Sequence, residues 1–227
     1  MSETSARPQP RPAFVRLILA RHGEASGNRE MRYLGRTDAP LTERGEAQAR
    51  QLAAALSGFP IATVYSSPLQ RAERTAAAIA EMLGLPVVPR DDLREQDFGT
   101  WENRTRAEVL AEDAAALAAW ESGVEVAPPE GETPLALRAR VVACADELAA
   151  RHPSQSVVLA SHVGPIKALI CAALGLPPSG AFRLWLDPAS FSVLDWRPNG
   201  GNGILRVFNS IAHLEPARWL RPHLTEA

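Results

Sequence analysis

The stretch that decides the fold is FVRLILARHGE, residues 14–24. Its first part, Phe14–Ala20, is a short and nearly continuous apolar run that ends abruptly in Arg21-His22-Gly23-Glu24. A run of this kind is typical of a strand buried on both faces of a mostly parallel sheet. The sequence therefore predicts a central strand whose carboxyl end carries an arginine and a histidine.

Helical and strand patterns alternate downstream of this segment. Further strands are predicted at Ile61–Tyr65, Pro86–Val88, Val157–Ala160, Phe191–Trp196 and Ile204–Phe208. Helices are predicted at Thr42–Leu56, at Thr133–Arg151, from about Gly164 onward, and at Ser67–Leu83, where Ser67 is the N-cap, Pro68 the first residue and Gln70 completes a capping box. The last two strands flank a turn-rich segment, which favours an antiparallel hairpin at the sheet edge.

This alternation predicts an α/β fold. We expect a three-layer α/β/α sandwich with a mostly parallel central sheet and an antiparallel edge. Residues 14–227 are predicted as one domain, because no repeat or linker divides them. The segment 91–131 has helical pieces separated by loops and is predicted as a helical cap or lid insertion. Residues 1–13 are predicted as a disordered leader.

Composition and charge narrow the function. The formal charge is −2, without a large basic tract, which argues against nucleic acid as the main ligand. The two cysteines, Cys144 and Cys171, lack CxxC spacing, so a disulfide framework or a cysteine zinc site is not expected. The start of the chain lacks the apolar core of a signal peptide, and no later stretch is long enough to span a membrane. We expect a cytoplasmic protein that does not act at a membrane.

Polar side chains collect where three of the predicted strands end. The first strand ends in Arg21-His22, the second leads into Arg71, and the fourth leads into Ser161-His162. In open α/β sheets the carboxyl ends of the strands line the binding crevice. Arginine offers a planar fork of donors to phosphate oxygens, and a histidine among arginines stays neutral and able to attack phosphorus. This pattern indicates phosphoryl transfer.

Four segments resemble the histidine phosphatase superfamily, also called phosphoglycerate-mutase-like. They are LARHGEA at 19–25, SSPLQRAERTA at 66–76, LREQDFGTWE at 93–102 and SHVGPIKAL at 161–169. They follow one another in the family's order, and the resemblance runs from about Leu17 to His213. One departure is Ala25, where many members carry threonine or serine.

The resemblance implies roles for particular residues. His22 would be the phosphorylated nucleophile and Glu95 the proton donor. Arg21, Arg71 and His162 would hold the phosphate and act in catalysis, and Asn28 and Val163 would join them in binding phosphate or substrate. No metal site and no cofactor are expected, since no metal-ligand spacing is present and the arginines supply the positive charge.

Plainer interpretations of these residues exist. His22 could be a satisfied histidine at a strand end, and Arg71 a surface arginine in a salt bridge. Asp91, Asp92 or Glu102 could be the acid in place of Glu95. The ordered companions of His22 and Arg71 argue against the first two interpretations, whereas the crowded acids leave the third open.

Three functions fit the resemblance. The first is a phosphatase in which water resolves the phosphohistidine, the second a phosphoglycerate mutase, and the third a non-catalytic scaffold. The site is complete, which argues against the scaffold, and the short stretch between Glu95 and His162 resembles the phosphatase branch. Segments 161–174 and 182–214 resemble α-ribazole phosphatase-type proteins. The expected partner is a small phosphorylated metabolite, such as α-ribazole 5′-phosphate, and a homodimer stays open.

Overall fold

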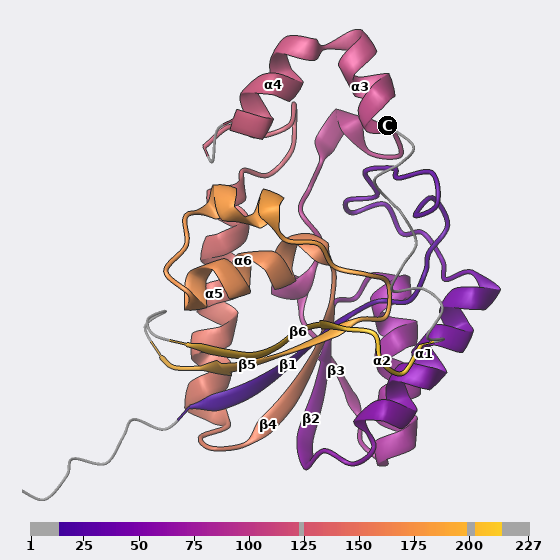
Figure 1. The fold of residues 1–227 in the computed structure, drawn as a ribbon, viewed down its shortest axis with the longest axis vertical. Helices are drawn as coiled ribbons and strands as arrows, with labels where there is room; N and C mark the ends of the chain where they lie inside the picture. The colour runs from indigo at the N-terminus through magenta and orange to yellow at the C-terminus, as the bar shows by residue number, and fades with distance from the viewer. Residues whose placement is uncertain (1–13, 123–124, 199–202, 215–227) are drawn as a thin grey trace, which may run out of the picture.

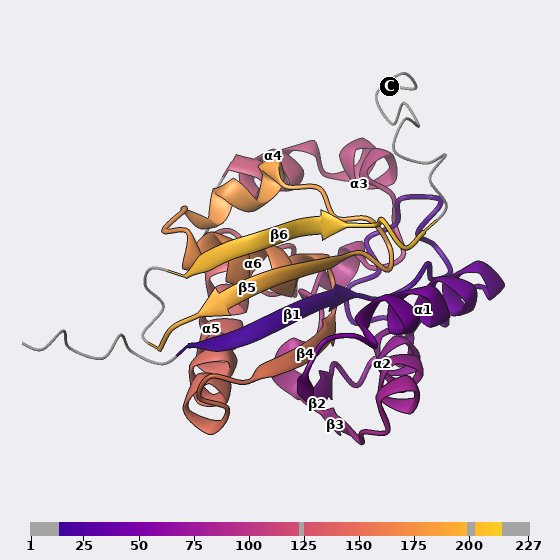
Figure 2. The same cartoon turned by 60° about the horizontal axis from the view of Figure 1, so that its bottom comes forward.

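The computed structural model describes residues 14–122, 125–198 and 203–214. The expected leader, residues 1–13, and the turn at 199–202 lie outside them. Six strands form one sheet in the order β3-β2-β4-β1-β5-β6 (Figures 1 and 2). They are β1 (Val15–Arg21), β2 (Ile61–Ser66), β3 (Val87–Pro89), β4 (Ser156–Ser161), β5 (Phe191–Trp196) and β6 (Ile204–Ser210). The first four pair in parallel and the last two antiparallel, which confirms the predicted sheet.

Helices cover both faces of the sheet, as the sandwich prediction requires. In Figure 1, α1 (Glu43–Leu56) and α2 (Gln70–Leu83) lie on one side, and α5 (Pro134–Arg151) and α6 (Val163–Ala173) on the other. Two shorter helices, α3 (Arg106–Glu112) and α4 (Ala114–Ser122), stand at one end of the molecule beyond α6. No helix in the described ranges combines the length and the apolar character needed to cross a membrane.

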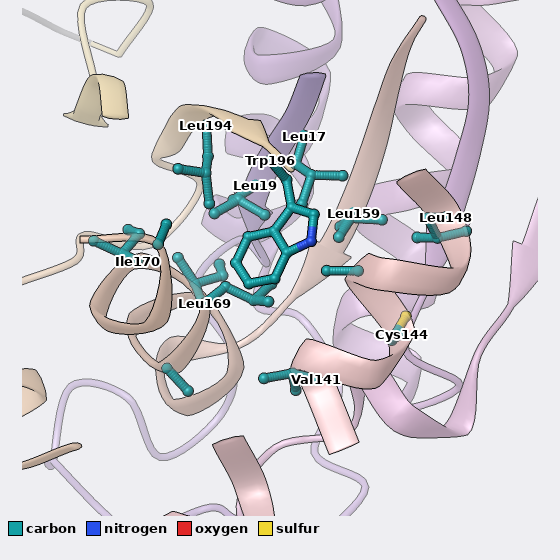
Figure 3. Packing of buried hydrophobic residues seen from close by; sticks show 14 of the residues in the cluster. Leu17, Leu19, Val141, Cys144, Leu148, Leu159, Leu169, Ile170, Leu194 and Trp196 are labelled. Carbon is teal, nitrogen blue, oxygen red and sulfur yellow. The ribbon is translucent and has the colours of Figure 1, made fainter. Parts of the chain in front are cut away.

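Strand β1 contributes to two separate hydrophobic cores because successive side chains point to opposite faces. Leu17 and Leu19 belong to the core beneath α5 and α6, while Ile18 and Ala20 belong to the core beneath α1 and α2. The first core is built around Trp196 (Figure 3), whose indole Nε1–H donates to Asp146 Oδ1 at 2.8 Å. A strand buried on both sides holds its carboxyl end in a fixed place, and that end is Arg21.

The start of α2 differs from the prediction. The helix begins at Gln70, and Ser67 is not its N-cap. Instead, the Gln70 N–H donates to the carboxylate of Asp38 at 2.7 Å, so a loop distant in sequence caps the helix. The Ser67 hydroxyl lies 2.8 Å from Nε2 of His162 and accepts from the Leu69 N–H at 3.3 Å, and the predicted capping box with Gln70 does not form.

The segment between β3 and α5 contains mostly short helical pieces. Two 3-10 helices, Asp91–Leu93 and Gly99–Trp101, precede α3 and α4. Trp101, Val109, Leu117 and Trp120 form a small hydrophobic cluster of their own, apart from the two cores that flank the sheet. That this segment is a lid stays a prediction.

Candidate active site

The loop after β1 is held tightly against α1 and α2. The His22 N–H donates to Ser161 O at 3.1 Å, and the Gly23 N–H donates to Thr75 Oγ1 at 3.1 Å. A Cβ atom on Gly23 would lie 2.4 Å from Gly45 O, so only glycine allows this approach between the loop and the first turn of α1. The sequence RHG therefore fixes where the side chains of Arg21 and His22 stand.

His22 is buried, with one ring nitrogen engaged. Its Nδ1 lies 2.7 Å from Gly23 O, and because a carbonyl only accepts, Nδ1 carries the proton. Nε2 is then the nitrogen with the free lone pair. Burial, followed by the charges of Arg71 and Arg21, holds the pKa of His22 well below its ordinary value. The ring is therefore neutral at pH 7, as a nitrogen nucleophile must be.

Arg21 is buried and only partly satisfied. Its Nη1 donates to Leu186 O, but its Nε is buried without a hydrogen-bond partner among the described residues. Burial lowers the pKa of Arg21 to about 10, which still leaves the guanidinium charged at neutral pH. A buried charged donor without a partner is costly, and a phosphoryl oxygen would satisfy it.

Arg71 is almost completely buried, with 1% of its surface exposed, so it is not a surface arginine. Nη1 donates to Thr37 O and Nη2 to Gly35 O, each at 2.7 Å, and Nε donates to Nδ1 of His162 at 3.2 Å. A guanidinium has five N–H donors, so some of those on Arg71 stay available to a ligand. The carbonyls of Gly35 and Thr37 thus hold the Arg71 guanidinium in place at the carboxyl end of the parallel strands.

His162, the residue just before α6, faces His22. The two ring centroids lie 5.1 Å apart. Since Nδ1 accepts from Arg71, Nε2 carries the proton and donates to Ser67 Oγ. Burial and the charge of Arg71 lower the pKa of His162 well below its ordinary value. Both ring nitrogens have protein partners here, and Ser67 is a site residue that the sequence analysis had assigned to a helix cap.

Glu95 lies in the loop after the 3-10 helix Asp91–Leu93, and its carboxylate reaches the N-terminus of α6. Its Oε1 accepts from the Gln96 N–H at 2.8 Å and from the Gly164 N–H at 3.0 Å. A Cβ atom on Gly164 would lie 2.3 Å from Oε1, so glycine is required for this contact. Burial raises the pKa of Glu95, against the opposing effects of these hydrogen bonds and of Arg71 and Arg140. A raised pKa suits a carboxyl group that must give up a proton near neutral pH.

The two remaining site predictions are placed less directly. Asn28 lies in the loop after β1, where its Oδ1 accepts from the Ala25 N–H at 2.8 Å. Val163, the first residue of α6, lines a cavity of about 140 Å³ together with Glu95 and Gly164. A contact of either residue with phosphate stays a prediction. The structure adds site groups that the sequence does not predict, namely Gly164, Ser67 and the carbonyls of loop 35–37.

From the sequence alone, three other acids are also candidates for the proton donor. Glu102 accepts from the Arg36 N–H and from Thr37 Oγ1, each at 2.6 Å. Asp91 pairs with Arg94, and Asp92 with Arg90. None of the three lines the cavity beside Glu95. No group of three or more His, Cys, Asp and Glu residues in the described chain is arranged to hold a metal ion.

Buried arginines and histidines at the carboxyl end of the parallel strands define an α/β protein with a site suited to a small anion. The chain belongs to the histidine phosphatase superfamily (branch 1), whose family model matches residues 17–209. The four resembling segments lie within this range.

Relatives in the family carry phosphatase names. The chain is 38% identical over 202 residues to phosphoserine phosphatase 1 of Hydrogenobacter thermophilus, covering 88% of this chain and 95% of the relative. It is 34% identical over 199 residues to the adenosylcobalamin/alpha-ribazole phosphatase of Escherichia coli, covering 87% and 97%. A solved mycobacterial glucosyl-3-phosphoglycerate phosphatase superposes with a TM-score of 0.79 at 32% identity, covering 88% of this chain and 100% of that one. Against mycobacterial relatives 37% identical to it, the chain spans 57% of their length.

Proposed function

We propose that this protein hydrolyses a small phosphorylated metabolite, a phosphomonoester, through a phosphohistidine at His22. One observation carries the proposal: a neutral histidine with a free Nε2 stands among two buried arginines that keep unused donors. Phosphoryl transfer needs positioning and positive charge more than it needs covalent chemistry from the protein, and this site offers both. Arg21 and Arg71 would stabilise the charge on the phosphoryl oxygens.

The reaction would run in two halves. In the first, Nε2 of His22 attacks phosphorus, the N–P bond forms, the P–O ester bond breaks, and the leaving oxygen takes the proton of Glu95. In the second, water attacks phosphorus and gives a proton to Glu95 while the N–P bond breaks. Inorganic phosphate leaves, and both residues return to their starting protonation states.

His162 would contact the phosphoryl group after a small exchange of partners. When a phosphoryl oxygen draws the Nε–H of Arg71 away, Nδ1 of His162 is freed. Ser67 Oγ both donates and accepts, so it holds Nε2 of His162 in either tautomer. Nδ1 can then carry the proton and donate it to phosphate. Asn28 and the backbone N–H of Val163 would add further donors.

The phosphatase alternative is favoured over a mutase by the names of the relatives quoted above, and the complete site argues against a scaffold. The E. coli relative supports α-ribazole 5′-phosphate as one candidate substrate. A cytoplasmic location and a homodimer stay predictions. Activity should survive exhaustive chelation, because the arginines supply the charge that a metal would bring; activity lost with EDTA and restored by zinc would contradict this proposal.

The decisive experiment traps the phosphoenzyme. Rapid quench with a labelled phosphomonoester should give an adduct that is labile in acid and stable in base, as a phosphoramidate is. The adduct should be absent in His22→Ala. His152→Gln is the matched control, because His152 caps the far end of α5 and contacts Tyr65 rather than the site. An adduct that persists in His22→Ala would exclude His22 as the nucleophile.

A further inference from the structure

A cavity of about 140 Å³ lies beside Glu95, where the leaving group of the proposed reaction would be. Its walls are mainly apolar and include Phe98, Trp120 and Phe182. An apolar cavity of about 150 Å³ is just large enough for benzene. The leaving group that fits is therefore small, on the scale of a three-carbon alcohol, and a nucleoside-sized group would extend out of the cavity.

Two cationic side chains, Lys167 and Arg138, line this small cavity. Lys167 is the only lysine in the chain, among 24 lysines and arginines. It lies three residues after Gly164 on α6, so it is on the same helix face as the N–H that Glu95 accepts. Within the described residues, no hydrogen bond or ion pair engages its Nζ.

Glu95 is the only acid among the described residues of the cavity wall, and its carboxylate accepts from the Gln96 and Gly164 N–H groups rather than forming an ion pair with Lys167. Burial raises the pKa of Glu95, which is the direction that the acid of the proposed reaction needs. Burial also lowers the pKa of Lys167, while the charge of Glu95 acts in the opposite direction. Arg138 uses Nη1 to donate to Leu176 O at 2.8 Å and keeps its other donors. Within the described residues, neither Lys167 nor Arg138 forms an ion pair with an acid, so both cations remain available to an anionic ligand.

Besides the two cations, the cavity wall contains a buried indole N–H without a hydrogen-bond partner among the described residues. Trp120 is 6% exposed, and its indole Nε1 is buried without a hydrogen-bond partner among the described residues. Leaving such a donor unpaired costs about 1–3 kcal/mol. An acceptor on a bound ligand would remove that cost. Lys167, Arg138 and the Trp120 indole all donate hydrogen bonds. A ligand that fits this cavity therefore needs acceptor groups.

We propose that the preferred substrate is a phosphomonoester of a small hydroxy acid, and that Lys167 binds its carboxylate. The proposal rests on the proposed phosphatase function and names the substrate class of that site. The phosphoryl group would lie between Arg21 and Arg71, and the ester oxygen at Glu95. The short carbon chain would lie against the apolar wall, with the carboxylate at Lys167.

The test compares two substrates that differ at one group. 3-Phosphoglycerate carries the carboxylate, and glycerol 1-phosphate has a hydroxymethyl group in its place. In Lys167→Met, kcat/KM should fall about 10- to 100-fold for 3-phosphoglycerate, the range of a lost charged hydrogen bond, and little for glycerol 1-phosphate. Lys167→Arg should keep most of the preference. Arg183→Met is the control, because Arg183 is exposed near Phe182 but does not line the cavity.

A second measurement avoids any variant of Lys167. Reductive methylation with ¹³C-formaldehyde keeps the charge of a lysine and, besides the N-terminal amine, labels only Lys167 in this chain. In the His22→Ala background, which should not turn substrate over, 3-phosphoglycerate should shift the dimethyl-lysine NMR signal saturably. Glycerol 1-phosphate should shift it much less at equal occupancy.

Several outcomes would overturn the inference alone. They are equal losses for both substrates in Lys167→Met, an unmoved NMR signal at saturating 3-phosphoglycerate, or a higher wild-type kcat/KM for glycerol 1-phosphate or α-ribazole 5′-phosphate. Hydrolysis of p-nitrophenyl phosphate is measured alongside. A wild-type protein that hydrolyses none of these esters would instead overturn the proposed function, and the inference with it.

Discussion

Glu102→Ala should impair phosphate binding although Glu102 does not line the cavity. Glu102 acts on Arg71 through loop 35–37. Its carboxylate accepts from the Arg36 N–H and from the Thr37 hydroxyl. The Gly35 and Thr37 carbonyls of the same loop accept from Arg71. The loop lies close over the carboxylate, since a Cβ atom on Gly35 would be 2.2 Å from Glu102 Oε1. Without Glu102, the carbonyls that aim Arg71 lose their support.

The size of the effect follows from the two hydrogen bonds. Bonds to a charged acceptor contribute about 1.5–3 kcal/mol each, so their joint loss is worth at least about 3 kcal/mol at this half-buried site. If half of that loss reaches Arg71, kcat/KM should fall about tenfold, and if all of it does, about a hundredfold. Inhibition by inorganic phosphate should weaken by a similar factor.

The assay also separates positioning from acid catalysis. Transition-state charge on the phosphoryl oxygens is common to all phosphomonoesters, so Glu102→Ala should slow an alkyl phosphate and p-nitrophenyl phosphate equally. Glu112→Ala, which removes an exposed acid paired with Arg104, is the control. Unchanged inhibition by phosphate in Glu102→Ala would refute the positioning role. A loss confined to alkyl phosphates would make Glu102 the proton donor.

Three further predictions follow from the site. Glu95→Gln should slow phosphorylation of His22 by alkyl phosphates about 10²–10⁴-fold and by p-nitrophenyl phosphate much less, measured in single turnovers; equal losses would exclude Glu95 as the acid. Gly164→Ala should displace the Glu95 carboxylate and reproduce that leaving-group dependence, whereas Gly180→Ala, with no atom nearer than 3.4 Å to the new Cβ, should not. The lowered pKa values of His22 and His162 mean that the folded state binds fewer protons than the unfolded one, so stability present above pH 6.5 is lost as the pH falls. Urea unfolding should show a decline of at most about 1.4 kcal/mol per pH unit for each histidine, and a slope unchanged in His22→Gln would contradict the burial argument.

The sequence predicts the fold well where local pattern and burial agree. The apolar run at the start of β1, the alternation of strands and helices, and the hairpin of β5 and β6 are confirmed. The predicted start of α2 is wrong for a physical reason: Ser67 and Gln70 fit a local capping box, but in the folded chain they bond to His162 and Asp38 from distant segments. Helix-capping propensity describes only neighbouring residues, whereas hydrogen bonds to distant segments decide where the helix begins.

The candidate site is also predictable only in part, because sheet topology can be predicted from the sequence and long-range side-chain contacts cannot. His22, Arg71 and His162 follow strands, so sheet topology brings them together. The contact between Glu95 and Gly164 joins residues 69 positions apart, and the sequence contains no periodic signal for it. The neutral state of His22 could be anticipated from the arginines around it, whereas the unpaired Nε of Arg21 is visible only in the folded chain.

The separate hydrophobic cluster of Trp101, Val109, Leu117 and Trp120 has a consequence for engineering. Because it shares no buried residue with the two cores that flank the sheet, we expect α3 and α4 to be exchangeable without disturbing those cores. Trp120 reaches the cavity from α4 and Phe98 from the segment before α3, while Lys167 reaches it from α6. Replacing α3 and α4 with the corresponding helices of a relative should therefore change which leaving-group alcohols are accepted and leave the chemistry at phosphorus intact. The contacts that α6 makes in the cavity should not change.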